Sequence, residues 1–263
     1  MMHSNIPGVP DFCSTEYAVR RTKYCLLIPI LNEGERIVNE LCRAMNNGVD
    51  EVVDIVICDG GSKDGSVSDK KMQQSGVNTL LIKTSSGKLS AQLRMGIWFS
   101  LERGYEGIIT VDGNDKDSIE DVPCFIDKLN EGYDFVQGSR FMKDGKAINT
   151  PLLRYVSVKM IHAPIISFTA GERFTDTTNA FRAYSRKYLE HPQVQPLRDI
   201  FMTYELLAYL SVRASQLRLK TCEIPVTRAY PPKGKTPTKI SPIKGNSELL
   251  RILFKNYNGD YTP

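Results

Sequence analysis

The fold is decided by residues 107–117, where a β-branched run passes into three closely spaced carboxylates: Gly107-Ile108-Ile109-Thr110-Val111-Asp112-Gly113-Asn114-Asp115-Lys116-Asp117. A short apolar run with this ending predicts a buried strand that delivers acidic side chains into a loop. Carboxylates this close repel one another unless a cation or a proton lies between them. A hard divalent ion with oxygen ligands suits such a site, but Asp, Gly and Asn also form ordinary surface turns. The stretch alone leaves both interpretations open.

A second acidic loop comes earlier in the chain and favours the first interpretation. Residues 59–66, Asp-Gly-Gly-Ser-Lys-Asp-Gly-Ser, follow the apolar run 52–58. The spacing fits neither a Walker loop nor a Rossmann glycine motif, which argues against both of those phosphate sites. Glycines still permit close backbone approach to a ligand, so the loop suits a nucleotide held by acidic residues. An ordinary turn between a strand and a helix is the alternative.

Strands and helices alternate along the first half of the chain. The predicted strands are 24–30, 52–58, 79–82 and 107–110, followed by a fifth strand and its loop over 135–140. The predicted helices are 35–45, one capped by Ser66, 89–101 and 118–129. Pro29 is expected to end the pairing of the first strand. This alternation predicts an α/β fold with a central, mainly parallel sheet flanked by helices. Ligands of such sheets bind beyond the carboxyl ends of the strands, where the polar loops lie.

The second half is less regular. It is expected to contain a helix at 152–168, a strand at 179–184, a helix at 202–214, a strand at 217–226 and an amphipathic helix at 248–255. The last helix can lie on a bilayer or simply pack on the domain. Residues 1–22 are polar and are expected to form an irregular N-terminal arm.

Composition bounds the class of protein. With 41% hydrophobic and 24% charged residues among 263, the chain resembles an ordinary globular protein. A net charge of +4 is too small to indicate nucleic acid, but residues 218–263 hold nine Lys and Arg against three Asp and Glu. That excess suits phosphates or an anionic membrane face.

No signal peptide or membrane-spanning run is expected from the sequence. The six cysteines are dispersed, which suits a reducing cytoplasm rather than a zinc site.

Several motifs in register resemble family-2 glycosyltransferases, and within that family dolichyl-phosphate mannose synthase and bacterial polyprenyl-phosphate glycosyltransferases. They are residues 28–33 (Ile-Pro-Ile-Leu-Asn-Glu), 59–66, Asp112-Gly113-Asn114, Gly138-Ser139-Arg140, 176–186, and Glu223-Ile224-Pro225-Val226 followed by Arg228. The resemblance spans about residues 24–245. It implies a GT-A fold, a single Rossmann-like domain over 23–245 with a nucleotide-binding half (23–117) and an acceptor half (118–245). Residues 246–263 would form the C-terminal helix and tail.

The resemblance also implies roles for individual residues. The nucleotide-sugar would be bound by Pro29, Asn32, Glu33, Asp59, Gly61, Asp112, Gly113, Arg228, Lys235 and Lys239. Mg²⁺ or Mn²⁺ would be bound by Asp112 and Asn114, with Asp115 or Asp117 as substitutes. Asp112, Arg140 and Arg182 would act near the phosphates, where arginine pairs bidentately with oxyanions.

Three positions depart from the family pattern. Asn114 replaces the second carboxylate of the metal motif, Gly60 replaces a second aspartate, and Arg94 stands where the family often has asparagine. An amide can still bind a hard cation but adds no charge. These departures leave open the alternative that the chain is a non-catalytic relative, which binds a nucleotide-sugar without transferring the sugar.

The predicted function is inverting transfer of a sugar from a nucleotide-diphosphate sugar. A polyprenyl phosphate acceptor is already ionised, whereas an alcohol would need a general base. Glu205 is the candidate base, with a solvated helix carboxylate as the alternative. A soluble enzyme that uses a glycan or small molecule in polysaccharide biosynthesis also remains open, as does a nucleotidyltransferase. We expect a cytoplasmic protein, peripheral on the membrane face if its acceptor is a lipid. The sequence indicates no oligomeric state.

Overall fold

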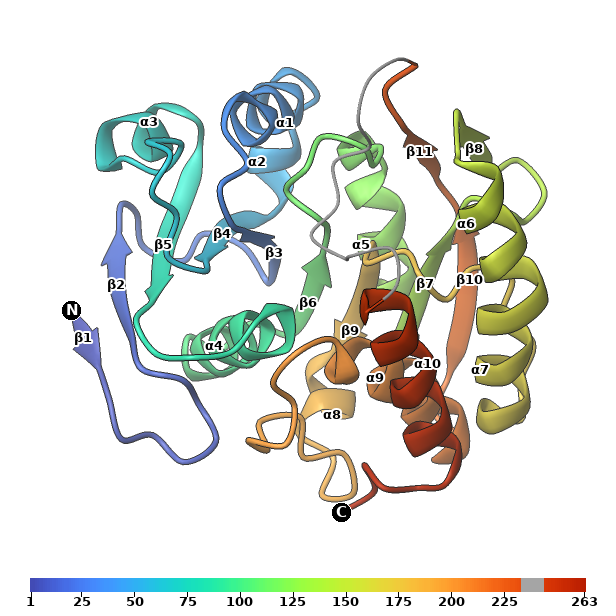
Figure 1. Ribbon diagram of the computed structural model, residues 1–263. Helices are drawn as coiled ribbons and strands as arrows, with labels where there is room; N and C mark the ends of the chain where they lie inside the picture. Colours follow the sequence, from blue (N-terminus) through green and yellow to red (C-terminus); the bar gives the residue numbers. More distant parts are fainter. Residues whose placement is uncertain (233–243) are drawn as a thin grey trace.

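The computed structural model (Figure 1) describes residues 1–232 and 244–263, which are built around a nine-stranded sheet. The strand order is β1-β2-β5-β4-β3-β6-β9-β7-β10. Four strands of the first half pair in parallel: β3 (Tyr24–Ile30), β4 (Asp54–Asp59), β5 (Val77–Lys83) and β6 (Gly107–Thr110). Nearly all their residues are buried, as in parallel strands covered on both faces. The predicted α/β fold with a mainly parallel sheet is confirmed.

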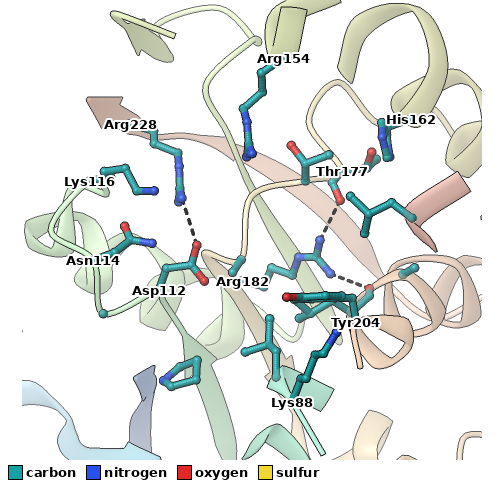
Figure 2. A pocket seen from close by; sticks show the side chains of 18 of the residues that line it. Lys88, Asp112, Asn114, Lys116, Arg154, His162, Thr177, Arg182, Tyr204 and Arg228 are labelled. Atoms are coloured by element: carbon teal, nitrogen blue, oxygen red, sulfur yellow. Dashed lines mark hydrogen bonds and ion pairs between the residues drawn. The ribbon is translucent and has the colours of Figure 1, made fainter. Parts of the chain in front are cut away.

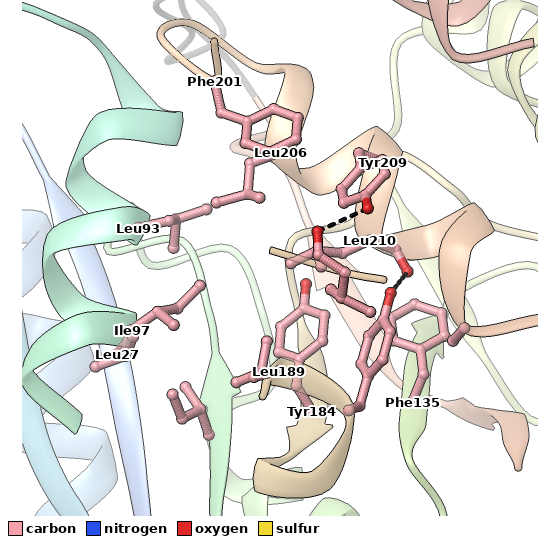
Figure 3. Packing of buried hydrophobic residues seen from close by; sticks show 14 of the residues in the cluster. Leu27, Leu93, Ile97, Phe135, Tyr184, Leu189, Phe201, Leu206, Tyr209 and Leu210 are labelled. Carbon is pink, nitrogen blue, oxygen red and sulfur yellow. Dashed lines mark hydrogen bonds between the residues drawn. The ribbon is translucent and has the colours of Figure 1, made fainter. Parts of the chain in front are cut away.

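Helices cover both faces of this sheet, and successive strand residues alternate between two apolar clusters. One face carries α1 (Glu35–Asn46), α2 (Val49–Val52), the 3₁₀ turn η1 (Ile119–Asp121) and α5 (Val122–Asn130). The other carries α4 (Leu89–Glu102) and α9 (Glu205–Gln216). Figure 3 shows Leu93 and Ile97 of α4 packed with Leu206 of α9 over the sheet.

The second half of the chain completes the sheet. β7 (Phe135–Ser139) pairs in parallel with β10 (Thr221–Pro225), and β9 (Arg182–Ser185) lies antiparallel between β6 and β7. A small second sheet joins β8 (Lys146–Ile148) to β11 (Thr227–Ala229). The remaining helical segments are α3 (Asp69–Gln74), α6 (Leu152–Ser157), the π-helical turn η2 (Val158–His162), α7 (Ala163–Ala170), α8 (Arg186–Leu189) and α10 (Lys244–Tyr257).

The C-terminal helix packs on the domain. α10 lies beside α7 and α9 (Figure 1), where Asn256 donates to the Ala208 carbonyl at 2.9 Å and the rings of Phe168 and Tyr257 are 5.9 Å apart. Of the two alternatives for this helix, packing is therefore observed. None of the helices in the described ranges is long and apolar enough to cross a membrane.

Three local predictions were wrong. The first 22 residues are not irregular, because β1 (Met2–His3) and β2 (Phe12–Glu16) extend the sheet, with β2 antiparallel to β5 and Phe12 fully buried. Pro29 does not end its strand, since it stands opposite Cys58 of β4, beyond the end of the pairing with β6. The helix after the acidic loop is capped by Ser68, whose hydroxyl accepts from the Lys71 amide, rather than by Ser66.

Gly96 sets the distance between α4 and the central strands, which gives a stability prediction. A Cβ at this position would lie 2.6 Å from Cys58 Sγ and 2.8 Å from Leu27 Cδ1. We expect Gly96→Ala to lower the free energy of unfolding by about 1–3 kcal/mol through overpacking, more than the helix propensity of alanine restores. Urea denaturation measures this, with the exposed α4 substitution Glu102→Ala as control. A variant as stable as wild type would contradict the packing described.

Candidate active site

A cavity of about 1020 Å³ lies at the carboxyl ends of the central strands. Its lining comes from the ends of β3 and β4, the loop after β6, the start of α4, and the segments α6, η2, α7, α9, β11 and α10. Figure 2 shows the side chains gathered there. The loops that the sequence placed at one edge of the sheet thus meet at one cavity.

The loop after β6 forms the polar floor. Asp112, Gly113, Asn114 and Lys116 all line the cavity. Gly113 has no room for a side chain, because a Cβ would lie 2.4 Å from Cγ2 of Ile30. The Asn114 amide donates to the Asp112 carbonyl at 2.8 Å, which closes a tight turn. The side-chain Oδ1 of Asn114 is buried without a hydrogen-bond partner, so it is an acceptor that a ligand can satisfy.

Arg228 connects β11 to this floor. Its Nη2 lies 3.0 Å from Oδ2 of Asp112, and its Nη1 pairs with Asp117, whose carboxylate is fully buried. Burial alone would raise the pKa of Asp112, but Arg228 and then Lys116 outweigh it and hold that pKa below its ordinary value. For Asp117 burial prevails over Arg228, so its pKa is raised. Asp112 is therefore an ionised group held in an ion pair.

Positive charge dominates the cavity. Among the described residues that line it, six are basic (Arg36, Lys88, Lys116, Arg154, Arg182 and Arg228) and two are acidic (Glu33 and Asp112). Burial, followed by the repulsion of Arg228, lowers the pKa of Lys116 to about 8. Such an excess of cations in a partly enclosed space attracts a polyanionic ligand.

Arg182 is a buried part of the cavity wall. Its guanidinium is almost fully buried and donates to the carbonyls of Asn179, Thr177 and Leu207 at 2.8, 2.9 and 2.6 Å. These three bonds join the segment before β9 to α9 and hold the guanidinium in place (Figure 2).

Two residues of α1 fix the far side of the acidic loop. The Asp115 amide donates to Oε2 of Glu40 at 2.8 Å, and Arg43 lies 3.3 Å from the Asp115 carboxylate. Arg43 also donates to the Asp117 carbonyl at 2.6 Å. Asp115, predicted as a metal ligand, therefore faces α1 and is not part of the cavity lining.

The loop 59–66 is held by its own side chains. Asp59 is buried and accepts from the amides of Gly61 and Ser62 at 3.0 and 2.9 Å. The side-chain Oδ1 of Asn32 accepts from the backbone amide of Lys63 at 2.8 Å. The backbone amide of Asn32 donates to Ser62 Oγ at 2.8 Å. Asp59, Gly61 and Asn32 thus shape this loop, and Gly60 is the residue that lines the cavity.

Of the other residues predicted to bind the donor, Pro29 and Glu33 line the cavity. Glu33 pairs with Arg36 at 2.7 Å. Lys235 and Lys239 lie outside the described residues.

Two residues predicted to be catalytic lie away from the cavity lining. Arg140 is buried in an ion pair with Asp176, 2.6 Å from Nε to Oδ2, and donates to Thr178 Oγ1 at 2.8 Å. It supports Thr178, which does line the cavity. Glu205 accepts from the Thr203 amide and hydroxyl at 2.6 and 2.7 Å, at the start of α9.

The wall opposite the acidic loop is apolar. It is formed by Leu153, Val158, Ile166, Leu207, Leu249, Ile252 and Leu253, from α6, η2, α7, α9 and α10. These helices were predicted from the sequence. That they share a cavity with the acidic loops was not predicted, because their apolar residues look like ordinary core residues. Arg154 and Lys116 were also missed, although Lys116 stands inside the stretch that predicted the site.

Residues 25–191 match the family model for glycosyl transferase family 2. The chain belongs to this family. The resemblance predicted from the motifs is confirmed, and the match includes both acidic loops and Arg182.

Individual relatives of this glycosyltransferase are distant. Glycosyltransferase AglJ of Haloferax volcanii is 25% identical over 88% of the chain and 71% of the relative. Polyprenol monophosphomannose synthase of Mycolicibacterium smegmatis is 27% identical over 90% of the chain and 87% of the relative. Glucosyl-3-phosphoglycerate synthase of Mycobacterium tuberculosis, crystallised with Mn²⁺, UDP-glucose and phosphoglyceric acid, superposes with a TM-score of 0.64 at 13% identity, over 89% of this chain and 79% of that one. That likeness confirms the GT-A fold.

The side chains at the acidic loop do not fit a divalent metal well. Within the described ranges, no three His, Cys, Asp or Glu side chains gather closely enough to hold a metal ion. Asp112 is the one carboxylate of the loop that faces the cavity, and it is already paired with Arg228. A cation bound beside it would also face Lys116, so two positive side chains would oppose it.

The Arg228 ion pair gives a second stability prediction. We expect Arg228→Met to lower the free energy of unfolding by about 3–5 kcal/mol, because Asp117 would keep a buried charge without its partner. The control is Lys23→Met, which breaks the exposed pair with Glu106 and should cost less than about 1 kcal/mol. Urea denaturation compares the two. Equal losses would mean that Arg228 does not hold the floor of the cavity together.

Proposed function

We propose that this family 2 glycosyltransferase moves a sugar from a nucleotide-diphosphate sugar to a polyprenyl phosphate, with inversion at the anomeric carbon. The observation that carries the proposal is a single cavity with a cationic floor and an apolar wall. The floor suits phosphates, and the wall suits a hydrocarbon chain. A ligand with both parts is a lipid phosphate.

The donor would lie over the floor, with its nucleoside toward Pro29, Glu33 and Gly60 and its diphosphate toward Lys116 and Arg228. An oxygen of the acceptor phosphate attacks the anomeric carbon as the bond from that carbon to the diphosphate breaks. The products are a glycosyl polyprenyl phosphate and a nucleoside diphosphate, which takes the electron pair of the broken bond. Fixed cations stabilise the charge that develops on this leaving group.

The state of the cavity carboxylates supports a phosphate acceptor. Among the described cavity residues, the carboxylates are Glu33, paired with Arg36, and Asp112, paired with Arg228. Neither is well placed to take a proton from an alcohol, and Glu205 is bound to Thr203. A phosphate acceptor needs no base because it is ionised at neutral pH, and Arg154 can pair with it.

The outer surface around the apolar wall supports a peripheral membrane contact. α6, η2 and α7 expose Leu152, Leu153, Val156, Met160 and Phe168, and the neighbouring α10 exposes Phe254. An exposed apolar patch of this kind is typical of an interaction site. It would let the protein take a lipid phosphate from the surface of a bilayer. All six cysteines are free thiols, which agrees with the cytoplasmic face.

The relatives support the same acceptor class. Besides the polyprenol monophosphomannose synthase, an undecaprenyl-phosphate mannosyltransferase of Micrococcus luteus is 25% identical over 76% of the chain and 81% of the relative.

A divalent ion bound at the acidic loop, as expected from the sequence, is the alternative to stabilisation by fixed cations. Its support is the family resemblance and the Mn²⁺ bound in crystals of glucosyl-3-phosphoglycerate synthase. Asp112 and the unpartnered oxygen of Asn114 would be its ligands. Because Arg228 and Lys116 oppose a cation there, we assign no step of the transfer to a metal.

The apolar wall can be tested with one substitution at its rim. Leu153 lines the cavity and is 73% exposed, so Leu153→Asp should not unfold the protein. We expect it to raise KM for a long-chain polyprenyl phosphate in vesicles by about ten- to hundredfold, because the bound hydrocarbon chain would no longer bury an apolar leucine at this position. KM for a water-soluble short-chain isoprenyl phosphate should change little. Release of nucleoside diphosphate measures both.

The matched control is Val19→Asp, which changes another exposed apolar residue, 82% exposed, outside the cavity lining. It should leave both KM values unchanged. Transfer to a glycan or a small soluble acceptor that is faster than transfer to any lipid phosphate would overturn the proposed acceptor.

A further inference from the structure

Lys116 lies in the loop to which the family resemblance assigned a divalent ion, and it lines the cavity. The loop after β6 presents the cavity with one carboxylate, one amide and this lysine. The lysine is 6% exposed, and its Nζ lies 5.1 Å from the ring centroid of Tyr230. In Figure 2 the ends of Lys116 and Arg228 lie next to one another over the Asp112 carboxylate.

The acidic residues that could complete a metal site face elsewhere. Asp115 is bound to Arg43 of α1, and Asp117 is fully buried against Arg228. A metal bound here would have only Asp112 and the amide oxygen of Asn114 as side-chain ligands from the loop, beside two positive side chains. The loop supplies Lys116, and β11 supplies Arg228.

The chemistry needs positive charge at this position, whatever its source. A departing nucleoside diphosphate gains negative charge as the sugar bond breaks, and a charge held in place in a partly water-excluded site stabilises it strongly. A lysine ammonium and an arginine guanidinium can provide positive charge in place of a divalent ion. Nη1 and Nη2 of Arg228 already donate to Asp117 and Asp112, which fixes the plane of the guanidinium beside the cavity.

We propose that Lys116 is a catalytic residue that, together with Arg228, neutralises the leaving diphosphate, so that sugar transfer requires no divalent metal. This inference rests on the proposed function. In the step, the bond from the anomeric carbon to the diphosphate oxygen breaks and a bond to the acceptor phosphate oxygen forms. Lys116 keeps its proton throughout and donates hydrogen bonds to the departing oxygens.

The test compares turnover in EDTA with turnover in Mn²⁺ or Mg²⁺. We expect wild-type kcat in EDTA to lie within about twofold of its value with either ion, and Lys116→Met to lower kcat by about 10²–10³-fold, the effect of removing one charge-stabilising donor. Lys128→Met removes a lysine that pairs with Glu131 outside the cavity lining and should keep the wild-type rate. Loss of wild-type turnover in EDTA with recovery in Mn²⁺ would overturn the inference.

Binding provides a readout that does not depend on turnover. Titration calorimetry with UDP, GDP, ADP and CDP in EDTA should find one that binds wild type, and about ten- to hundredfold weaker binding of it to Lys116→Met. An unchanged affinity in that variant, or wild-type binding that appears only with Mn²⁺, would refute the role of Lys116. If none of the four binds with or without Mn²⁺, the proposed function itself fails, and the inference with it.

Discussion

Arg228 holds together parts of the chain that are far apart in sequence. It reaches from β11 to Asp112 and Asp117, which flank the turn after β6. Charges buried this deeply persist only when each has a partner. The ion pair therefore constrains the end of the central sheet, the start of the cavity wall and the position of Asp112 together. When a ligand enters the cavity, the charged side chains of the floor are already held in position by these ion pairs.

The sheet was largely predictable because its strands are apolar on both faces and are followed by turn residues. The apolar runs at β3, β4, β6 and β7 gave the order of the elements and the edge where ligands bind. β2 was missed because its sequence Phe-Cys-Ser-Thr-Glu is short and mostly polar, and only its pairing with β5 makes it a strand.

The location of the candidate site was predictable from the sequence, but only some of the residues that line it were. Asp112, Glu33 and Arg228 do line the cavity. Asp59 and Asp115 do not, because they bind loop amides and Arg43, and no sequence pattern reveals which carboxylates are used internally. Lys116 and Arg154 were missed because a lone basic residue in a loop or a helix is usually a solvent-exposed surface residue. Only the tertiary structure places both side chains in the lining of the cavity.

The structure combines a cationic floor and an apolar wall in one cavity. A crystal structure with a bound donor would show whether the diphosphate binds to the cations of that floor. Crystals would be grown with Mn²⁺ and a non-hydrolysable nucleotide-diphosphate sugar, and anomalous scattering would locate the metal. We expect diphosphate oxygens within hydrogen-bond distance of Lys116 and Arg228, with no manganese peak beside Asp112. A manganese ion bound by Asp112, Asn114 and the diphosphate, with the Lys116 side chain turned away, would contradict it.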